Sequence, residues 1–109
     1  MNMIGNSRIF LGTELKLNIH IEPISDLTMK DYDFNVDVFC SSRQVVNIKK
    51  EEAIYVDDTN YILLIDTNNI GIGNVKCKVT AYIPDQDFED GFRTEICGIK
   101  TDIEIVKSL

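Results

Sequence analysis

Few residues of this chain could carry out chemistry. It has one histidine, His20, which stands on the polar side of an alternating run, so its side chain is expected to face solvent. A serine or cysteine nucleophile would need this histidine as its base, and the GxSxG turn that presents a nucleophilic serine is absent from the sequence. We expect a surface histidine, with a role in binding or as a catalytic base as the alternatives. We therefore predict that the chain is not an enzyme.

Carboxylates gather in residues 85–91, where they could bind calcium through their oxygen atoms. The EF-hand pattern is not met, because Gly91 comes one position late and the distal glutamate is missing. We interpret this segment as the solvated tip of a hairpin, with a calcium site or a recognition loop as alternatives, and we expect no cofactor. The candidate calcium ligands are Asp85, Asp87, Glu89 and Asp90.

The three cysteines, Cys40, Cys77 and Cys97, each stand in a strand-like run beside apolar residues. Their odd number argues against a complete disulfide framework, so we expect buried free thiols that act as small apolar side chains. The alternative is one disulfide, for which Cys77 and Cys97 are the best candidates. A metal site is not expected, because no CxxC spacing exists and His20 is far from every cysteine in sequence.

The composition is that of one globular domain. The chain has 109 residues and a net charge of −7, with 18 acidic and 11 basic side chains. A negative surface repels phosphate, so we expect no nucleic-acid partner. No apolar run approaches the ~20 residues that a bilayer requires, so we expect no membrane insertion. The first residues lack the basic start and apolar stretch of a secretory signal, which favours synthesis in the cytoplasm.

Alternation of apolar and polar residues with a period of two dominates the chain and predicts strands with one buried face. Three long runs show it, over residues 14–22, 32–40 and 75–83. Shorter strands are expected over residues 45–49 and 53–56, and the apolar run 61–65 is expected to be a central strand. The residues predicted to face the core are Leu15, Leu17, Ile19 and Ile21, then Tyr32, Phe34, Val36, Val38 and Cys40, and finally Val75, Cys77, Val79, Ala81 and Ile83.

The last strand is expected over residues 92–106, and its apolar pattern changes phase along its length. The early phase places Phe92, Thr94 and Ile96 inward, whereas the late phase places Ile99, Thr101, Ile103 and Ile105 inward. A β-bulge at Cys97-Gly98 would explain the slip, because glycine can adopt the backbone angles that a bulge requires.

About seven strands with turns every 8–12 residues, and no convincing helix, are typical of a β-sandwich. We predict an all-β, immunoglobulin-like antiparallel sandwich that forms a single domain over residues 9–109. Residues 1–8 are expected to be a mobile arm, and Ile9-Phe10-Leu11 could begin an extra strand or dock onto a partner. In the loop between the first two long strands, we expect Leu27 to drop into the core.

The order of these features resembles the N-terminal immunoglobulin-like domain of phage baseplate upper proteins and related tail-fibre components. The resemblance covers about residues 9–107. It implies an assembly adaptor that belongs to a virion and is made in the bacterial cytoplasm, and it offers no catalytic residues. The segments that carry it are Gly12-Thr13-Glu14, Asp26-Leu27-Thr28, Ile70-x-x-Gly73-x-Val75, Gly91 and Arg93-Thr94.

Two functions are therefore expected. The first is a structural or interaction module of a phage or prophage tail or baseplate, which assembles with itself or with another tail component. The alternative is a cell-envelope module that binds carbohydrate or another surface protein, provided that a signal peptide was removed. Tryptophan is absent, so the aromatic side chains that could serve as contacts are Phe39, Phe88 and Tyr82, with Tyr55 a further one that could face outward.

Overall fold

The computed structural model describes residues 7–23, 26–41 and 44–107, and within them the chain is all-β. Eight strands and two short 3-10 turns follow one another along the sequence, which is one strand more than the pattern predicts. The strands are β1 (Ser7–Phe10), β2 (Glu14–His20), β3 (Asp33–Phe39), β4 (Val45–Lys49), β5 (Ile54–Asp57), β6 (Asn60–Asp66), β7 (Gly73–Pro84) and β8 (Phe92–Val106), and the turns are η1 (Lys50–Glu52) and η2 (Thr67–Asn69).

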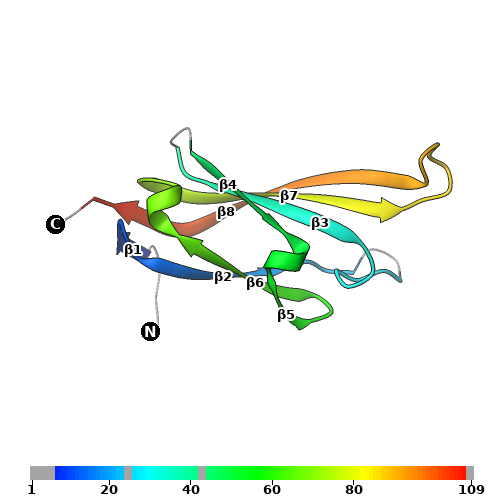
Figure 1. The fold of residues 1–109 in the computed structure, drawn as a ribbon, viewed down its shortest axis with the longest axis horizontal. Helices are drawn as coiled ribbons and strands as arrows, with labels where there is room; N and C mark the ends of the chain where they lie inside the picture. The colour runs from blue at the N-terminus through cyan, green and yellow to red at the C-terminus, as the bar shows by residue number, and fades with distance from the viewer. Residues whose placement is uncertain (1–6, 24–25, 42–43, 108–109) are drawn as a thin grey trace.

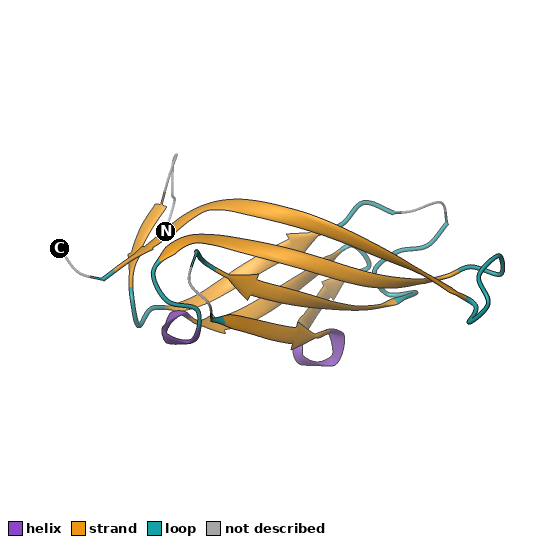
Figure 2. Cartoon of the chain, turned by 90° about the horizontal axis from the view of Figure 1, so that it is seen from above, coloured by secondary structure: helices purple, strands orange, loops and turns teal. Residues whose placement is uncertain are grey.

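The strands form two sheets that pack as a sandwich, which confirms the predicted fold class. One sheet has five strands in the order β1-β8-β7-β3-β4, and the other has three in the order β2-β6-β5. Figure 1 shows the smaller sheet on one side of the larger one, with β6 at its centre as predicted. The molecule measures 53 × 29 × 22 Å, and the hairpin β7–β8 extends beyond the other strands at one end (Figure 2).

The core lies between the two sheets and is built from the alternating residues that the sequence identifies. A side chain at every second position of a strand points to the same face, so each long strand contributes one apolar row. Leu17 and Ile21 are partly buried against this core. The buried residues of the long strands are Leu15 and Ile19 of β2, Phe34, Val36 and Val38 of β3, Tyr61, Leu63 and Ile65 of β6, Val75, Cys77, Val79, Ala81 and Ile83 of β7, and Ile105 of β8.

The connections between strands also fill the core. Leu27 is partly buried against it, as predicted, but Met29 in the same loop and Ile70 after η2 are completely buried. The ammonium group of Lys50 holds the end of this loop in place, because it donates to the carbonyl oxygens of Lys30 at 3.0 Å and Tyr32 at 2.8 Å. The side chain of Lys50 thus anchors this loop to η1.

Strand β8 keeps one phase throughout, so the predicted bulge at Cys97-Gly98 is wrong. Its pairing with β7 runs without interruption from Pro84 opposite Phe92 to Lys76 opposite Lys100. The irregularity lies further along, between Asn74 and Lys76. It places three residues of β8 opposite one of β7, so it preserves the parity of the strand. Thr101, Ile103 and Ile105 therefore share the core-facing side with Ile99, as predicted.

The early half of β8 presents its apolar residues to the outside. Phe92 and Ile96 are 49% and 63% exposed, whereas Arg93 and Glu95 lie on the core-facing side opposite Ile83 and Ala81. The prediction that the apolar residues of this half face the core is therefore wrong.

Strand β1 lies at the edge of the larger sheet, where it pairs in parallel with the end of β8, with Ile9 opposite Ile105. Ser7 and Arg8, which the sequence assigned to a mobile arm, therefore belong to this strand. Residues 1–6 of that expected arm lie outside the described part of the chain.

Candidate interaction surface

The face of the five-stranded sheet that points away from β2, β6 and β5 is called the outer face below. The register of β3, β7 and β8 places the even-numbered residues of β7 and β8 on it, together with the odd-numbered residues of β3. Read from the middle of the sheet towards the tip of the β7–β8 hairpin, its cross-strand rows are Phe39–Lys76–Lys100, Asp37–Lys78–Gly98, Asn35–Thr80–Ile96, Asp33–Tyr82–Thr94 and Pro84–Phe92.

Three large apolar or aromatic side chains form a strip along this face. Ile96 is 63% exposed, Phe92 49% and Tyr82 37%, and they lie on neighbouring rows of β7 and β8. Isolated apolar side chains are normal on a protein surface, but a contiguous group of them is typical of a contact site. Of the three aromatic contact candidates, Tyr82 lies in this apolar strip, Phe39 is half-buried in the first row of the same face, and Phe88 lies in the hairpin tip.

Near the middle of the sheet, beyond the apolar strip, lies a basic pair. Lys76 and Lys100 stand directly opposite each other on β7 and β8, and neither forms an ion pair with any described residue. Like charges in this position repel each other, which costs stability. Beside them Gly98 leaves a shallow hollow of about 260 Å³, lined by Phe39, Lys76, Ile99 and Lys100 as well as the glycine itself. We call this the glycine hollow.

The hairpin tip, residues 85–91, is acidic and well ordered by its own hydrogen bonds. Asp85 accepts from the backbone N–H of Asp87 at 3.0 Å, and its second oxygen accepts from Arg93 at 2.6 Å. The backbone N–H of Asp87 and the guanidinium of Arg93 together hold the pKa of the Asp85 carboxyl below its usual value. Phe88, 49% exposed, stands at the end of this tip.

The four candidate calcium ligands do not meet at one point. Asp85 is committed to Arg93, and Asp90 accepts from the backbone N–H of Phe92 at 3.1 Å. Across the described ranges, no group of three histidine, cysteine or carboxylate side chains is placed to hold a metal ion. The loop carboxylates instead hold the turn and charge its surface.

Beside Tyr82, a second depression of about 340 Å³ carries amide groups. Its floor lies between β3 and β4, where the side-chain amide of Asn47 donates to Asn35 at 3.0 Å and to Asp37 at 2.9 Å. The amide of Asn35 in turn lies 3.5 Å from the hydroxyl of Tyr82. The lining residues are Asp33, Phe34, Asn35, Asn47, Lys49, Glu51 and Tyr82.

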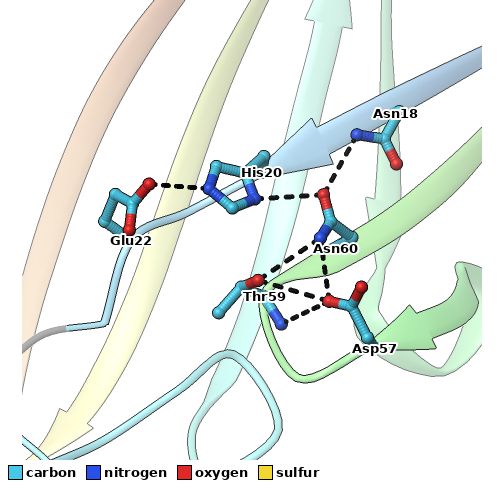
Figure 3. Close-up of polar contacts among 6 residues, drawn as sticks. All are labelled: Asn18, His20, Glu22, Asp57, Thr59 and Asn60. Atoms are coloured by element: carbon cyan, nitrogen blue, oxygen red, sulfur yellow. Dashed lines mark hydrogen bonds and ion pairs between the residues drawn. The ribbon is translucent and has the colours of Figure 1, made fainter.

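His20 lies on the opposite side of the molecule, exposed at the end of β2 as its position predicts, and it forms part of a polar chain (Figure 3). Its Nε2 lies 2.8 Å from a carboxylate oxygen of Glu22, and its Nδ1 lies 3.0 Å from the amide oxygen of Asn60. The amide nitrogen of Asn60 donates to Asp57 at 2.8 Å, which turns its oxygen towards the ring.

Both ring nitrogens therefore face acceptors. Only the imidazolium can donate from both nitrogens at once. The carboxylate of Glu22, followed by the amide of Asn60, accordingly raises the pKa of His20. Because both nitrogens are engaged, this arrangement leaves neither of them free to accept a proton from a nucleophile.

All three cysteines are free thiols, and two of them, Cys40 and Cys77, are buried as expected. Burial raises the pKa of Cys77 to about 11 and also raises that of Cys40. Cys97 is exposed, so the expected burial is wrong for this thiol, although its pairing with the buried Val79 places it on the core-facing side of β8.

The disulfide considered between Cys77 and Cys97 is not formed. Cys77 stands opposite Ile99, and Cys97 stands opposite Val79. The two cysteines are therefore diagonal neighbours, and diagonal positions on adjacent strands are ~7–8 Å apart, beyond the reach of a relaxed disulfide.

Phe39, Tyr82 and Phe88 were predicted from the sequence as contact residues, whereas Phe92 and Ile96 were not. Both were assigned to the core because they are apolar residues in an alternating strand. The sequence did contain a signal for their exposure. The late half of the strand has its apolar residues at odd positions, so one continuous strand would place Arg93 and Glu95 on the core-facing side and the even-numbered Phe92 and Ile96 on the outer side.

Comparisons with protein-family models, curated proteins and solved structures find no match to this chain. Within residues 7–23, 26–41 and 44–107, no helix is long and apolar enough to cross a membrane.

Proposed function

We propose that this chain is a non-catalytic interaction module that builds a larger protein assembly, as an adaptor of a phage or prophage tail or baseplate. The observation that carries the proposal is the apolar strip of Tyr82, Phe92 and Ile96 on the outer face. The early half of β8 carries charged residues on its core-facing side and apolar residues on its outer side, and such an exposed apolar group is suited to contact another protein.

The strand order is similar to that of the immunoglobulin-like fold that the resemblance implies, a fold shared by domains with many functions. In the immunoglobulin sandwich, the first, second, fifth and fourth strands form one sheet, and the third, sixth and seventh form the other. Here β2-β6-β5 packs against a sheet that contains β3, β7 and β8. This is similar to that arrangement, except that β1 joins the larger sheet and not the sheet of β2, and that β4 is an additional strand at the other edge.

The test is recovery of the chain from assembled particles. We expect a tagged copy made in its native host to co-purify with tail particles and to be identified in them by mass spectrometry. The variant Phe92→Ser/Ile96→Ser should be incorporated at least about tenfold less, because anchors at the centre of a contact commonly contribute more than 1 kcal/mol each.

The matched control is Ile54→Ser/Leu64→Ser, which removes two exposed apolar residues from the smaller sheet. This control should be incorporated like the unchanged chain. Particles that lack the chain while the host expresses it would contradict the proposal, and so would equal incorporation of both variants.

The depression at Tyr82 favours a second function, that of a carbohydrate-binding module of the cell envelope. An exposed aromatic ring beside side-chain amides and a carboxylate offers a sugar both a stacking surface and hydrogen bonds. Titration of a glycan library should then reveal a ligand whose binding is lost in Tyr82→Ala and weakened in Asn47→Ala. Binding that both variants retain would exclude this site.

A further inference from the structure

The outer face carries two features of opposite charge, an acidic tip at its end and a basic pair near its middle. The acidic tip presents Asp87 and Glu89, whose carboxylates form no hydrogen bond or ion pair with the described residues. The basic pair, Lys76 and Lys100, lies on the same face eight residues along β8 from Phe92, a distance of roughly 26 Å in an extended strand. The apolar strip lies between them.

The tip is positioned to reach beyond its own molecule. Figure 1 shows the end of the β7–β8 hairpin rising away from β2 and β6, on the side of the outer face. Its backbone is fixed by bonds from Asp85 N–H to the Gly91 carbonyl and from Gly91 N–H to the Phe88 carbonyl, both 2.9 Å. A tip that is already ordered loses little freedom when it binds, which favours recognition.

The basic pair is a costly feature without a partner. Two lysines opposite each other repel, and each would be stabilised by a carboxylate brought from outside. The glycine hollow beside them has the Phe39 ring and lysine stems as its walls, a suitable environment for an aromatic side chain.

One arrangement satisfies both features. If two copies stack their outer faces with strands antiparallel, a two-fold axis at Glu95 places each residue of β8 over the residue equally far on the other side. Phe92 then lies over Gly98 of the second copy, and Lys100 lies over position 90, in the acidic tip. The aromatic ring meets the hollow in the same register in which the carboxylates meet the lysines.

We propose that the chain forms an antiparallel two-fold dimer through its outer face, in which Phe92 of each copy occupies the glycine hollow of the other and the acidic tip covers Lys76 and Lys100. This inference rests on the proposed function and names a second copy as the partner of the same face. Such a contact is self-complementary and closed, so assembly stops at two copies.

The contact is small. A face two strands wide and about twelve residues long covers about 400 Å² on each copy. The total of about 800 Å² is below the size of most stable interfaces. The dimer should therefore be populated at high protein concentration and exchange rapidly, as suits a joint that other components of an assembly lock in place.

Sedimentation equilibrium of the purified chain, up to about 0.5 mM, measures the dimer directly. We expect a monomer–dimer equilibrium that weakens severalfold when salt rises from about 50 mM to about 500 mM. Lys76→Glu/Lys100→Glu and Asp87→Lys/Glu89→Lys should each weaken it at least tenfold. An equimolar mixture of these two variants should restore dimers. In the mixed dimer, the acidic residues at positions 76 and 100 of one variant meet the basic tip of the other, and the unchanged acidic tip meets the unchanged lysines.

Gly98→Val tests the hollow separately from charge. A Cβ at Gly98 has no neighbour within 4 Å, so the variant should fold normally while its side chain fills the hollow and weakens the dimer at least tenfold. Lys16→Glu/Lys30→Glu, which changes net charge as much as the lysine reversal but lies elsewhere, should dimerise like the unchanged chain.

A chain that stays monomeric throughout, forms oligomers larger than two, or dimerises equally well as Gly98→Val overturns the dimer. That failure is distinct from failure of the proposed function, because a monomeric chain that still enters particles through Phe92 and Ile96 would leave the assembly role standing with a different partner.

Discussion

At the scale of single residues, the surroundings of His20 set the pH dependence of the smaller sheet. Glu22 and Asn60 both accept from its ring, so the folded state favours the imidazolium and its pKa lies above the 6.5 of a free histidine. A pKa raised on folding contributes stability that is complete below the pKa of the unfolded chain and is lost as pH rises through the folded pKa. The part of the stability due to His20 should therefore decline from mildly acidic to mildly alkaline pH.

Titration of the ring by NMR checks this. Replacement of the carboxylate in Glu22→Gln should lower the pKa of His20 towards 6.5, because the neutral amide attracts the imidazolium less strongly. Glu14→Gln, the same change at the other end of β2, should leave the His20 titration unchanged. An unaltered pKa in Glu22→Gln would show that the carboxylate does not hold the ring in solution.

At the scale of elements, the entry into β7 depends on Gly73. Its φ is +128°, and a Cβ there would lie 2.7 Å from Ser41 Oγ and 3.3 Å from Cys40 Cβ. Gly73→Ala should lower the free energy of unfolding by about 1–3 kcal/mol, from backbone strain and from the close approach together. Denaturation in urea at low protein concentration measures the loss.

Gly98→Ala on the neighbouring strand is the matched control. This glycine has ordinary backbone angles and open space where a Cβ would stand, so the change should be neutral or stabilise by about 0.4–1 kcal/mol. If the two variants had the same free energy of unfolding, the prediction would be wrong, and the close approach to Ser41 would be relieved without loss of stability.

The strands were predictable from the sequence where the apolar residues of the alternating pattern are the buried ones and the polar residues face solvent. In β3 and β7 every apolar residue of the predicted row is enclosed, because these strands lie in the interior of the larger sheet and are covered by the smaller one. In β8 the core-facing positions before Ile105 are at most partly buried, and β1 pairs only with the last four residues of the strand. The sequence of one strand does not reveal how much of it its neighbours cover. The candidate surface at Phe92 and Ile96 was missed for that reason.

At the scale of the whole molecule, the loops complete the core. Met29 is fully buried although it belongs to a connection that has no periodic pattern, so its burial depends on how the two sheets are joined. Met29→Ala should reduce the free energy of unfolding by about 2–5 kcal/mol, through lost transfer energy and the cavity left behind.

Leu64→Ala provides the comparison in the same denaturation experiment. Leu64 is 53% exposed, so its truncation should change the stability by less than about 0.5 kcal/mol. Should Met29→Ala be equally mild, the loop would have to close over the cavity.

The arrangement in two sheets follows from the spacing of the strands, whereas the loop residues that complete the core carry no periodic signal in the sequence.

The parallel pairing of β1 with the end of β8 gives the fold a mechanical property. Four consecutive residue pairs, from Ser7 with Ile103 to Phe10 with Val106, join the first described strand to the last. A pull that draws the N-terminal end of β1 and the C-terminal end of β8 apart acts along both strands, so it loads these hydrogen bonds in shear and all must yield together. Tension on the tip of the β7–β8 hairpin would instead open its bonds one after another. A joint in a larger particle would thus resist stretching best when it is loaded through its two chain ends.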